Sequence, residues 1–283
     1  MTLTAVAGIP ETRAAVAALR AGGRRVALVP TMGALHAGHL ALVARARELA
    51  DAVVVSVFVN PLQFGPGEDF ERYPRALDDD RAALEAAGVD LLFAPTVADM
   101  YPDGGTQVTV QPGPVGDLFE GAVRPGHFAG VLTVVAKLLN IVGPDVAVFG
   151  QKDAQQVFLV RRMVSDLDLP VAVEAAPIVR EPDGLALSSR NRYLDGGHRA
   201  LASAMPAALA AARASAPGGA RAAVAAARGV LEDRPDARVD YVAVVDPATF
   251  QPVDDRYRGP ALVLLAARFG GTRLIDNGIV PVG

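Results

Sequence analysis

Short apolar runs alternate along the chain with longer segments that mix apolar and polar residues, as far as residue 179. The mixed segments predict helices at residues 9–19, 39–50, 78–87 and 130–142, and from the turn at 150–156 to about 167. The apolar runs have the length of buried strands and lie at residues 24–29, 52–60, 89–94, 145–149 and 171–179. Strands that alternate with helices are typical of a parallel sheet covered on both faces. The pattern therefore predicts an α/β fold, a Rossmann-like doubly wound parallel sheet.

The pattern changes after Gly196, where alanine becomes frequent. Two alanine-rich helices and three strands are predicted there, at residues 200–214, 220–231, 238–245, 261–268 and 272–276. Pro206 is expected to kink or delay the first of these helices. We therefore expect two domains, residues 1–178 and residues 179–283, the second being a smaller α+β C-terminal domain with antiparallel strands. Alternation of polar and apolar residues also predicts an exposed strand at 106–111.

Composition and charge narrow the class of protein. The chain has 283 residues, of which 51% are hydrophobic and 20% charged, as in soluble globular proteins that bury a sizeable core. Its net charge of −4 argues against a nucleic-acid partner or a membrane-surface role. It has no cysteine, which excludes disulfides, thiolate catalysis and thiolate metal sites. The N-terminal residues lack the features of a signal peptide, so the expected location is the cytoplasm.

The candidate chemistry begins in residues 30–39, Pro-Thr-Met-Gly-Ala-Leu-His-Ala-Gly-His, between a predicted strand and a predicted helix. This turn is expected at the carboxyl edge of a parallel sheet, where ligands bind. His36 and His39 could face one ligand, and a helix N-terminus just after His39 would suit a phosphate. The alternatives are two surface or capping histidines, or a metal pair.

Other polar clusters admit a functional and a structural interpretation. Asn60 and Gln63 stand in a loop that is either a plain turn or a substrate loop with two amide groups. Asp78, Asp79 and Asp80, in the first turn of a predicted helix, either stabilise the helix dipole or form a site for Mg²⁺. Arg124 and His127 either face phosphate or are a solvated arginine and a histidine bonded to backbone.

Two later turns could hold phosphate. Lys152 follows a strand and is a candidate for phosphate charge, with Asp153 as a candidate N-cap. Ser188, Ser189 and Arg190 could clamp a phosphate, since hydroxyl and guanidinium groups both donate to phosphoryl oxygens. The alternative for the serines is helix capping.

The His-Ala-Gly-His sequence resembles the His-x-Gly-His signature of the nucleotidyltransferase superfamily that includes class I aminoacyl-tRNA synthetases. Five motifs in order over residues 30–193 resemble one family of it, the pantothenate synthetases or pantoate–β-alanine ligases. These motifs are Pro-Thr-Met-Gly-Ala-Leu-His-x-Gly-His, Asn-Pro-x-Gln-Phe, Arg-Pro-x-His-Phe-x-Gly-Val, Gly-Gln-Lys-Asp-x-Gln-Gln and Leu-Ser-Ser-Arg-Asn. The resemblance implies an ATP-dependent condensation of pantoate with β-alanine through a pantoyl adenylate, releasing pyrophosphate and AMP.

The resemblance also implies a set of site residues. Catalytic roles fall to His36, His39, Lys152 and Arg190. ATP contacts are implied for Met32, Gly33, His36, His39, Gly150, Lys152, Asp153, Val179, Ser188, Ser189 and Arg190. Pantoate contacts are implied for Pro30, Met32, Asn60, Gln63 and Gln156. Arg124 is associated with the active site, His127 supports it or is structural, and Asp80 is implicated as a ligand of Mg²⁺.

The family further implies a homodimer that acts on small molecules, with no nucleic acid and no membrane as partner. We interpret residues 179–283 as a lid that shields the reactive adenylate from water. One rival is a sister nucleotidyltransferase acting on a phosphate group, which should lack the two glutamines. Others are a catalytically silent nucleotide-binding module and a hydrolase with histidine metal ligands.

Overall fold

The computed structural model describes residues 3–283, which form two compact units. The first unit holds the residues up to Gln151 together with residues 155–177. The second holds Lys152–Ala154 and Ile178–Gly283. The short turn around Lys152 thus belongs to the second unit, although the strand and helix on either side of it belong to the first.

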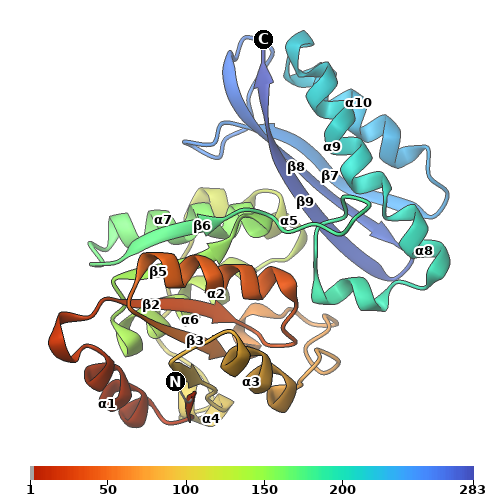
Figure 1. The fold of residues 1–283 in the computed structure, drawn as a ribbon. Coiled ribbons are helices and arrows are strands. Elements are labelled where there is room, and N and C mark those ends of the chain that lie inside the picture. Colours follow the sequence, from red (N-terminus) through yellow and green to blue (C-terminus); the bar gives the residue numbers. More distant parts are fainter. Residues whose placement is uncertain (1–2) are drawn as a thin grey trace. The chain divides into compact units, whose positions relative to one another are not determined.

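The described part of the first unit contains a parallel sheet of six strands in the order β1-β4-β3-β2-β5-β6 (Figure 1). The strands are β1 (Thr4–Val6), β2 (Val26–Thr31), β3 (Ala52–Val57), β4 (Leu91–Phe93), β5 (Val146–Gly150) and β6 (Ala172–Ala176). The longer helices are α1 (Ile9–Leu19), α2 (Ala37–Leu49), α3 (Leu77–Ala86), α6 (His127–Val142) and α7 (Ala154–Asp166), and α4 (Val97–Met100) and α5 (Glu120–Val123) are single turns.

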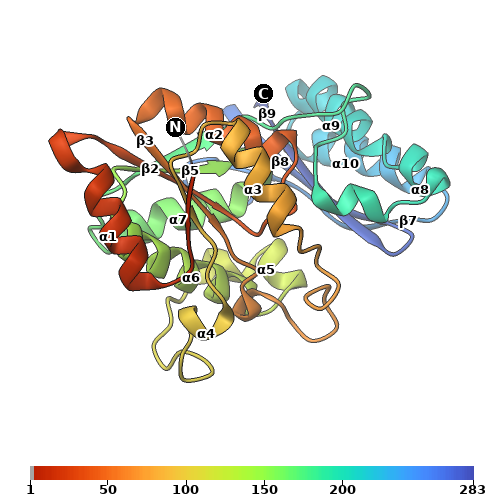
Figure 2. The same ribbon diagram turned by 60° about the horizontal axis from the view of Figure 1, so that its bottom comes forward.

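Apolar side chains pack on both faces of this sheet, which explains why its central strands are continuous apolar runs. On one face, Leu28 and Phe149 pack into a core with residues of α1, α6 and α7. On the other, Val29 and Val148 pack with residues of α2 and α3. Figure 2 shows α2 and α6 on opposite sides of the sheet. This arrangement confirms the predicted doubly wound fold.

The second unit contains an antiparallel sheet with helices packed against it, as predicted. Its strands β7 (Ala237–Val245), β8 (Gly259–Phe269) and β9 (Thr272–Val282) pair in sequence order. Helices α8 (Gly196–Leu201), α9 (Ala204–Ser215) and α10 (Ala220–Glu232) precede them. In Figure 1, α9 and α10 lie side by side along the sheet. Pro206 is the third residue of α9, so the helix does start late, after a break from α8.

Three details of the prediction are wrong. Strand β1 was missed, because two of its three residues are exposed and it gives no apolar run in the sequence. Residues 106–111 form no strand, and the Val110 N–H donates instead to the hydroxyl of Thr133. Helices α2 and α6 begin before the predicted residues, at Ala37 and His127. Within residues 3–283, none of the helices combines the length and apolar character needed to cross a bilayer.

Candidate active site

The strand order of the first unit marks where a ligand would bind. The chain runs from β2 outward to β3 and β4, and later from β5 outward to β6 in the other direction. The order therefore reverses between β2 and β5, which are neighbours in the sheet. In open α/β sheets, ligands bind beside such a reversal, at the carboxyl ends of the strands. The turn that contains His36 follows β2, and the Gln151–Asp153 turn follows β5.

The turn after β2 is held in place by hydrogen bonds to its backbone. The Thr31 hydroxyl donates to the Ser56 carbonyl (2.8 Å) and accepts from the Gly33 N–H (3.2 Å). The Asp80 carboxylate accepts from the N–H groups of Ala34 (2.9 Å) and Leu35 (2.7 Å). Gly33 has a φ of +81°, and a Cβ there would lie 2.8 Å from an Asp80 oxygen. The turn therefore requires glycine at this position and a carboxylate beneath it.

This arrangement gives Asp80 a structural role in the histidine turn. Asp80 is only 3% exposed, and each of its two oxygens accepts a backbone N–H. Among the residues that the structure describes, no three histidine or acidic side chains are grouped so as to hold a metal ion. Asp80 holds the backbone of the histidine turn, because a buried carboxylate needs donors and the turn supplies them. Its role as a Mg²⁺ ligand stays a prediction.

His36 and His39 lie side by side at the start of α2. Helix α2 begins at Ala37, so His36 is its N-cap and His39 its third residue, which corrects the expectation of a helix start after His39. The Gly38 N–H donates to Nδ1 of His36 (3.1 Å), and the His36 N–H donates to Nδ1 of His39 (3.3 Å). The ring centroids are 4.1 Å apart. Because both Nδ1 atoms accept, each neutral ring carries its proton on Nε2.

The loop after β3 joins two amide side chains that the sequence singled out. Asn60 is 1% exposed and Gln63 is 9% exposed. The Asn60 amide nitrogen donates to Oε1 of Gln63 (3.1 Å) and to the Gly130 carbonyl (3.1 Å). The Gln63 amide nitrogen in turn contacts the Met32 sulfur at 3.1 Å, so two of the expected substrate residues touch. The Tyr101 hydroxyl also donates to Oδ1 of Asn60 (2.8 Å), a contact that the sequence did not predict.

Arg124 and His127 both reach the backbone of Gln63. Arg124 pairs with the Glu68 carboxylate (2.6 Å) and also donates to His127 Nε2 (3.0 Å) and to the Gln63 carbonyl (3.3 Å). Since guanidinium has donors only, Nε2 of His127 must accept, and its Nδ1–H donates to the Gln63 carbonyl (2.8 Å). Arg124 is thus ion-paired rather than solvated, and His127 is bonded to backbone as its structural interpretation proposed.

Burial and charge keep this cluster in one protonation state. Burial and the neighbouring Arg124 charge lower the pKa of His127 from 6.5 to about 4. Burial alone would raise the pKa of Glu68, but the hydrogen bonds and charge of Arg124 outweigh it, and the net pKa lies below the ordinary value. At neutral pH, His127 is therefore neutral and Glu68 is ionised.

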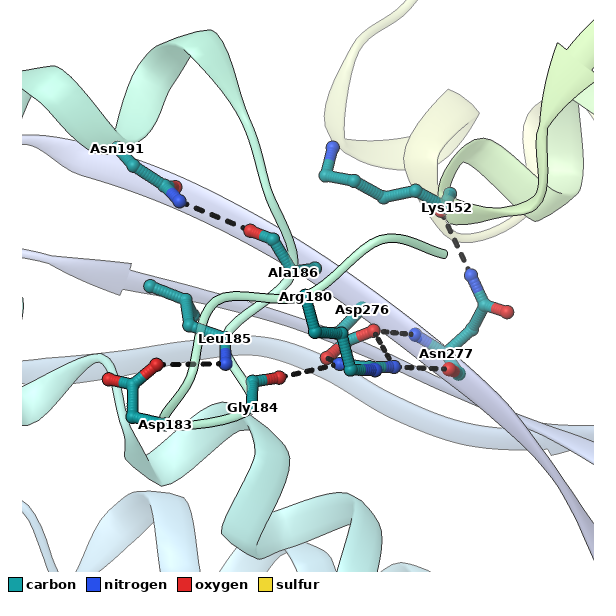
Figure 3. Close-up of polar contacts among 9 residues, drawn as sticks. All are labelled: Lys152, Arg180, Asp183, Gly184, Leu185, Ala186, Asn191, Asp276 and Asn277. Atoms are coloured by element: carbon teal, nitrogen blue, oxygen red, sulfur yellow. Dashed lines mark hydrogen bonds and ion pairs between the residues drawn. The ribbon is translucent and has the colours of Figure 1, made fainter. Parts of the chain in front are cut away.

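Lys152 is fixed through its backbone within the second unit. Figure 3 shows the Asn277 side chain donating to the Lys152 carbonyl, at 2.9 Å, while the lysine side chain extends away from this contact. The adjacent Asp276 carboxylate, 2% exposed, accepts two hydrogen bonds from Arg180 (2.7 and 3.0 Å) and one from the Asn277 N–H (2.8 Å). The two hydrogen bonds between the Arg180 guanidinium and the Asp276 carboxylate hold Arg180, the residue after Val179, against β9.

The Ser188–Arg190 segment forms the start of a short 3₁₀ turn, Ser189–Tyr193. The Ser188 hydroxyl accepts from the Arg190 N–H (3.2 Å), so this serine does cap a turn. Capping uses a lone pair of the hydroxyl and leaves its proton for an acceptor. Figure 3 shows the neighbouring Asn191, whose amide donates to the Ala186 carbonyl (3.1 Å) and ties the turn to the residues that precede it.

The remaining expected residues are placed as follows. Pro30 lies in β2, Gly150 ends β5, Asp153 is exposed, and Gln156 is half-buried in α7. Val179 accepts a backbone hydrogen bond from Leu187 (2.9 Å) within the second unit. The preceding glutamine, Gln155, is 4% exposed and bonds the carbonyls of residues 115 and 118, so it has a structural role.

The chain is similar to known proteins over nearly its whole length. The model of the family described as pantoate-beta-alanine ligase matches residues 4–279. A protein named pantothenate synthetase from Leifsonia xyli subsp. xyli is 60% identical over 94% of this chain and 93% of its own. A crystal structure of pantothenate synthetase from Thermus thermophilus is 53% identical, with a TM-score of 0.91 over 97% of this chain and 98% of that one.

A second similar solved structure is a complex with small molecules. It is a pantoate-beta-alanine ligase from Francisella tularensis, described as complexed with beta-gamma ATP and beta-alanine. It is 33% identical to this chain, with a TM-score of 0.82 over 98% of both chains.

Proposed function

This chain belongs to the pantoate-beta-alanine ligase family, and from that premise we propose how its residues share the reaction. The enzyme condenses pantoate with β-alanine in two steps. The pantoate carboxylate attacks the α-phosphorus of ATP, the bond to pyrophosphate breaks, and pantoyl adenylate forms. The β-alanine amine then attacks the acyl carbon, and AMP leaves. The first step needs stabilisation of phosphoryl charge rather than a covalent nucleophile from the protein.

The histidine pair at α2 carries this proposal. Asp80 holds the backbone of the turn, and the capping hydrogen bonds orient both imidazole rings with the proton on Nε2. The ring centroids are 4.1 Å apart. Two N–H donors beside a helix N-terminus suit the phosphate oxygens of ATP. His36 and His39 therefore bind and stabilise the phosphate charge, and Met32 and Gly33 in the same turn line the nucleotide.

The loop after β3 binds pantoate in this proposal. Gln63 supplies amide N–H donors, Asn60 orients it, and Pro30 and Met32 at the end of β2 form the neighbouring wall. Gln156, half-buried at the start of α7, supplies a second amide. Holding the carboxylate in line with the α-phosphorus gives the rate advantage of proximity. Arg124 and His127 support this loop through the Gln63 carbonyl and do not touch substrate.

We assign the positive charge and hydroxyl donors for the triphosphate to Lys152, Ser188, Ser189 and Arg190. Gly150, Asp153 and Val179 are assigned as further nucleotide contacts. Lys152 is held by Asn277, and Ser188 caps the turn that presents Arg190. Both contacts hold the backbone, and in this proposal the Lys152 and Arg190 side chains donate to the phosphate oxygens.

Mg²⁺ belongs to this proposal as the partner of ATP, whose phosphate charge it would neutralise when bound. The described residues offer no cage of three histidine or acidic side chains, and the Asp80 oxygens already accept two N–H groups. ATP phosphates and waters would then supply most of its ligands. A homodimer, a cytoplasmic location and a lid role for residues 179–283 stay predictions.

The test measures AMP and pyrophosphate release from ATP and Mg²⁺ with pantoate, with and without β-alanine. AMP release that needs both substrates supports the two-step ligase reaction. Turnover only with a phosphorylated acceptor would favour a sister nucleotidyltransferase, and ATP binding without turnover a silent module. Single-turnover adenylate formation by Lys152→Ala, compared with Arg192→Ala at an exposed arginine, tests the residue assignment. A normal rate in Lys152→Ala would remove Lys152 from the mechanism.

A further inference from the structure

Tyr101 stands behind the proposed pantoate loop. It follows α4, is 3% exposed, and donates its hydroxyl proton to Oδ1 of Asn60 at 2.8 Å. Burial raises the pKa of Tyr101 to about 12, so the hydroxyl keeps its proton at neutral pH. The Tyr101 ring packs near Phe58 and under the Lys137 ammonium, contacts that a phenylalanine would keep.

The orientation of the Asn60 amide is determined by backbone groups of fixed polarity. Its Nδ2 faces the Gly130 carbonyl at 3.1 Å, which can only accept. Its Oδ1 faces the Leu62 N–H at 3.3 Å, which can only donate. A flipped amide would set its oxygen against the Gly130 carbonyl and its NH₂ against the Leu62 N–H. The positions of Oδ1 and Nδ2 are therefore determined by these two partners. The Tyr101 hydroxyl must then donate to Oδ1.

The orientation of the Asn60 amide also determines that of the Gln63 amide. Because the second proton of Asn60 Nδ2 points at Gln63 (3.1 Å), the atom that receives it must be the oxygen Oε1. The Gln63 nitrogen is turned the other way, toward the Met32 sulfur, a weak acceptor at 3.1 Å. Gln63 therefore presents N–H donors, not an acceptor, on the side away from Asn60.

We infer that Tyr101 is a positioning residue which, through Asn60, fixes the Gln63 amide with its N–H donors toward the acid substrate. The inference rests on the proposed role of Gln63 in binding pantoate. An ionised carboxylate only accepts hydrogen bonds and must stay ionised to attack phosphorus, so a glutamine that faces it must donate. A flipped Gln63 would set an oxygen against the carboxylate and repel it.

The first test is Tyr101→Phe, which removes one oxygen and leaves the ring. We expect the KM for pantoate to rise about five- to tenfold, as for loss of one hydrogen bond that orders an amide pair, with an unchanged KM for ATP. Tyr257→Phe is the matched control, because its hydroxyl makes a bond of the same length, 2.8 Å, to the Pro260 carbonyl in the other unit. It should leave both KM values unchanged.

The second test reverses the polarity of Gln63 directly. Gln63→Glu keeps the acceptor for Asn60 but replaces the donors by a negative oxygen, whereas Gln63→Ala only removes them. We expect Gln63→Glu to raise the KM for pantoate more than Gln63→Ala does, by at least about tenfold, because it adds repulsion between like charges. Equal or better use of pantoate by Gln63→Glu would overturn the inferred polarity.

The two tests separate this inference from the proposed function. If Gln63→Ala leaves the KM for pantoate unchanged, the pantoate role of Gln63 fails, and the inference with it. If Gln63→Ala raises that KM while Tyr101→Phe does not, only the role of Tyr101 fails. Thermal unfolding of Tyr101→Phe is measured alongside, and an equal loss for pantoate and ATP would show a structural residue and reject the positioning role.

Discussion

The Asn277 side chain donates a hydrogen bond to the backbone carbonyl of Lys152, at 2.9 Å and across 125 positions of the sequence. Asn277 is 3% exposed, and its own N–H is bonded to Asp276, which pairs with Arg180. The backbone of a lysine assigned to ATP phosphate is thus tied to an ion pair whose carboxylate is buried. A flexible ammonium is a precise ligand only if its backbone is fixed, so this anchor should matter for catalysis.

Asn277→Ala should therefore slow adenylate formation about five- to twentyfold while changing the KM for pantoate little, since a mispositioned charge acts on the transition state. Single-turnover formation of pantoyl adenylate at saturating substrates measures this effect.

Asn140→Ala is the matched control, because that amide makes a similar bond, 2.8 Å to the Ala136 carbonyl, on an exposed helix face. It should keep the normal rate. An Asn277→Ala enzyme with normal adenylation would show that Lys152 needs no anchor.

Asp80→Asn should damage the histidine turn and not a metal site. An amide can accept at one position only and turns its NH₂ toward the N–H group of Ala34 or Leu35, which costs about 2–3 kcal/mol of unfolding free energy. Adenylation should fall with it, as the His36 and His39 rings lose their fixed place. Denaturant unfolding and the rate at increasing Mg²⁺ measure the two effects.

Asp78→Asn is the control, because Asp78 lies in the same first turn of α3 but is exposed. It should unfold as the wild type does. Recovery of the Asp80→Asn rate at high Mg²⁺ would instead restore the metal-ligand interpretation.

Local motifs predicted which residues of each loop lie together. The members of the His-Ala-Gly-His turn, the Asn60–Gln63 loop and the Arg124–His127 motif stand within a few positions of one another, so their proximity follows from the sequence, whereas their roles rest on the resemblance to the family. The apolar runs predicted the central parallel strands, because those strands are buried on both faces.

Contacts between distant segments were not predicted. Tyr101 and Asn277 bind partners 41 and 125 positions away, and a lone tyrosine or asparagine carries no periodicity or motif. The contact of Asp80 with the histidine turn was not predicted, because a carboxylate in a first helical turn has the same sequence context whether or not it binds a distant loop. The start of α2 was misplaced because histidine is not among the usual N-cap residues.

His127 should make the enzyme less stable as the pH falls below neutrality. Its pKa is about 4 in the folded state against 6.5 for the free group, so the unfolded chain binds the proton first. The unfolding free energy should therefore drop between pH 6.5 and 4, by roughly 3 kcal/mol in total for this group. Above pH 6.5 its contribution is fully present.

Denaturant unfolding at pH 7.5 and 4.5 would measure this drop in the wild type and in His127→Gln, which cannot titrate. The difference between the two proteins isolates His127 from the other acid-sensitive groups. Parallel pH profiles would mean that His127 is not held neutral, and the assigned Nδ1–H bond to the Gln63 carbonyl would then be in doubt.

Gly130 lets helix α6 lie directly against the pantoate loop. A Cβ at this position would stand 2.1 Å from the Leu62 carbonyl oxygen and 2.7 Å from the Gln63 nitrogen, both backbone atoms that cannot rotate away. Gly130→Ala should therefore push the loop off the helix and lengthen the bond from Asn60 to the Gly130 carbonyl. We expect a loss of about 2–4 kcal/mol in unfolding free energy and a raised KM for pantoate.

Gly229→Ala is the control and should instead raise the unfolding free energy, by about 0.5–1 kcal/mol. Gly229 lies inside α10, and a methyl group added there would have no atom within 4 Å. If both substitutions stabilise the protein, helix α6 does not contact the loop as closely as these distances require, and the fixed polarity of Asn60 loses its anchor.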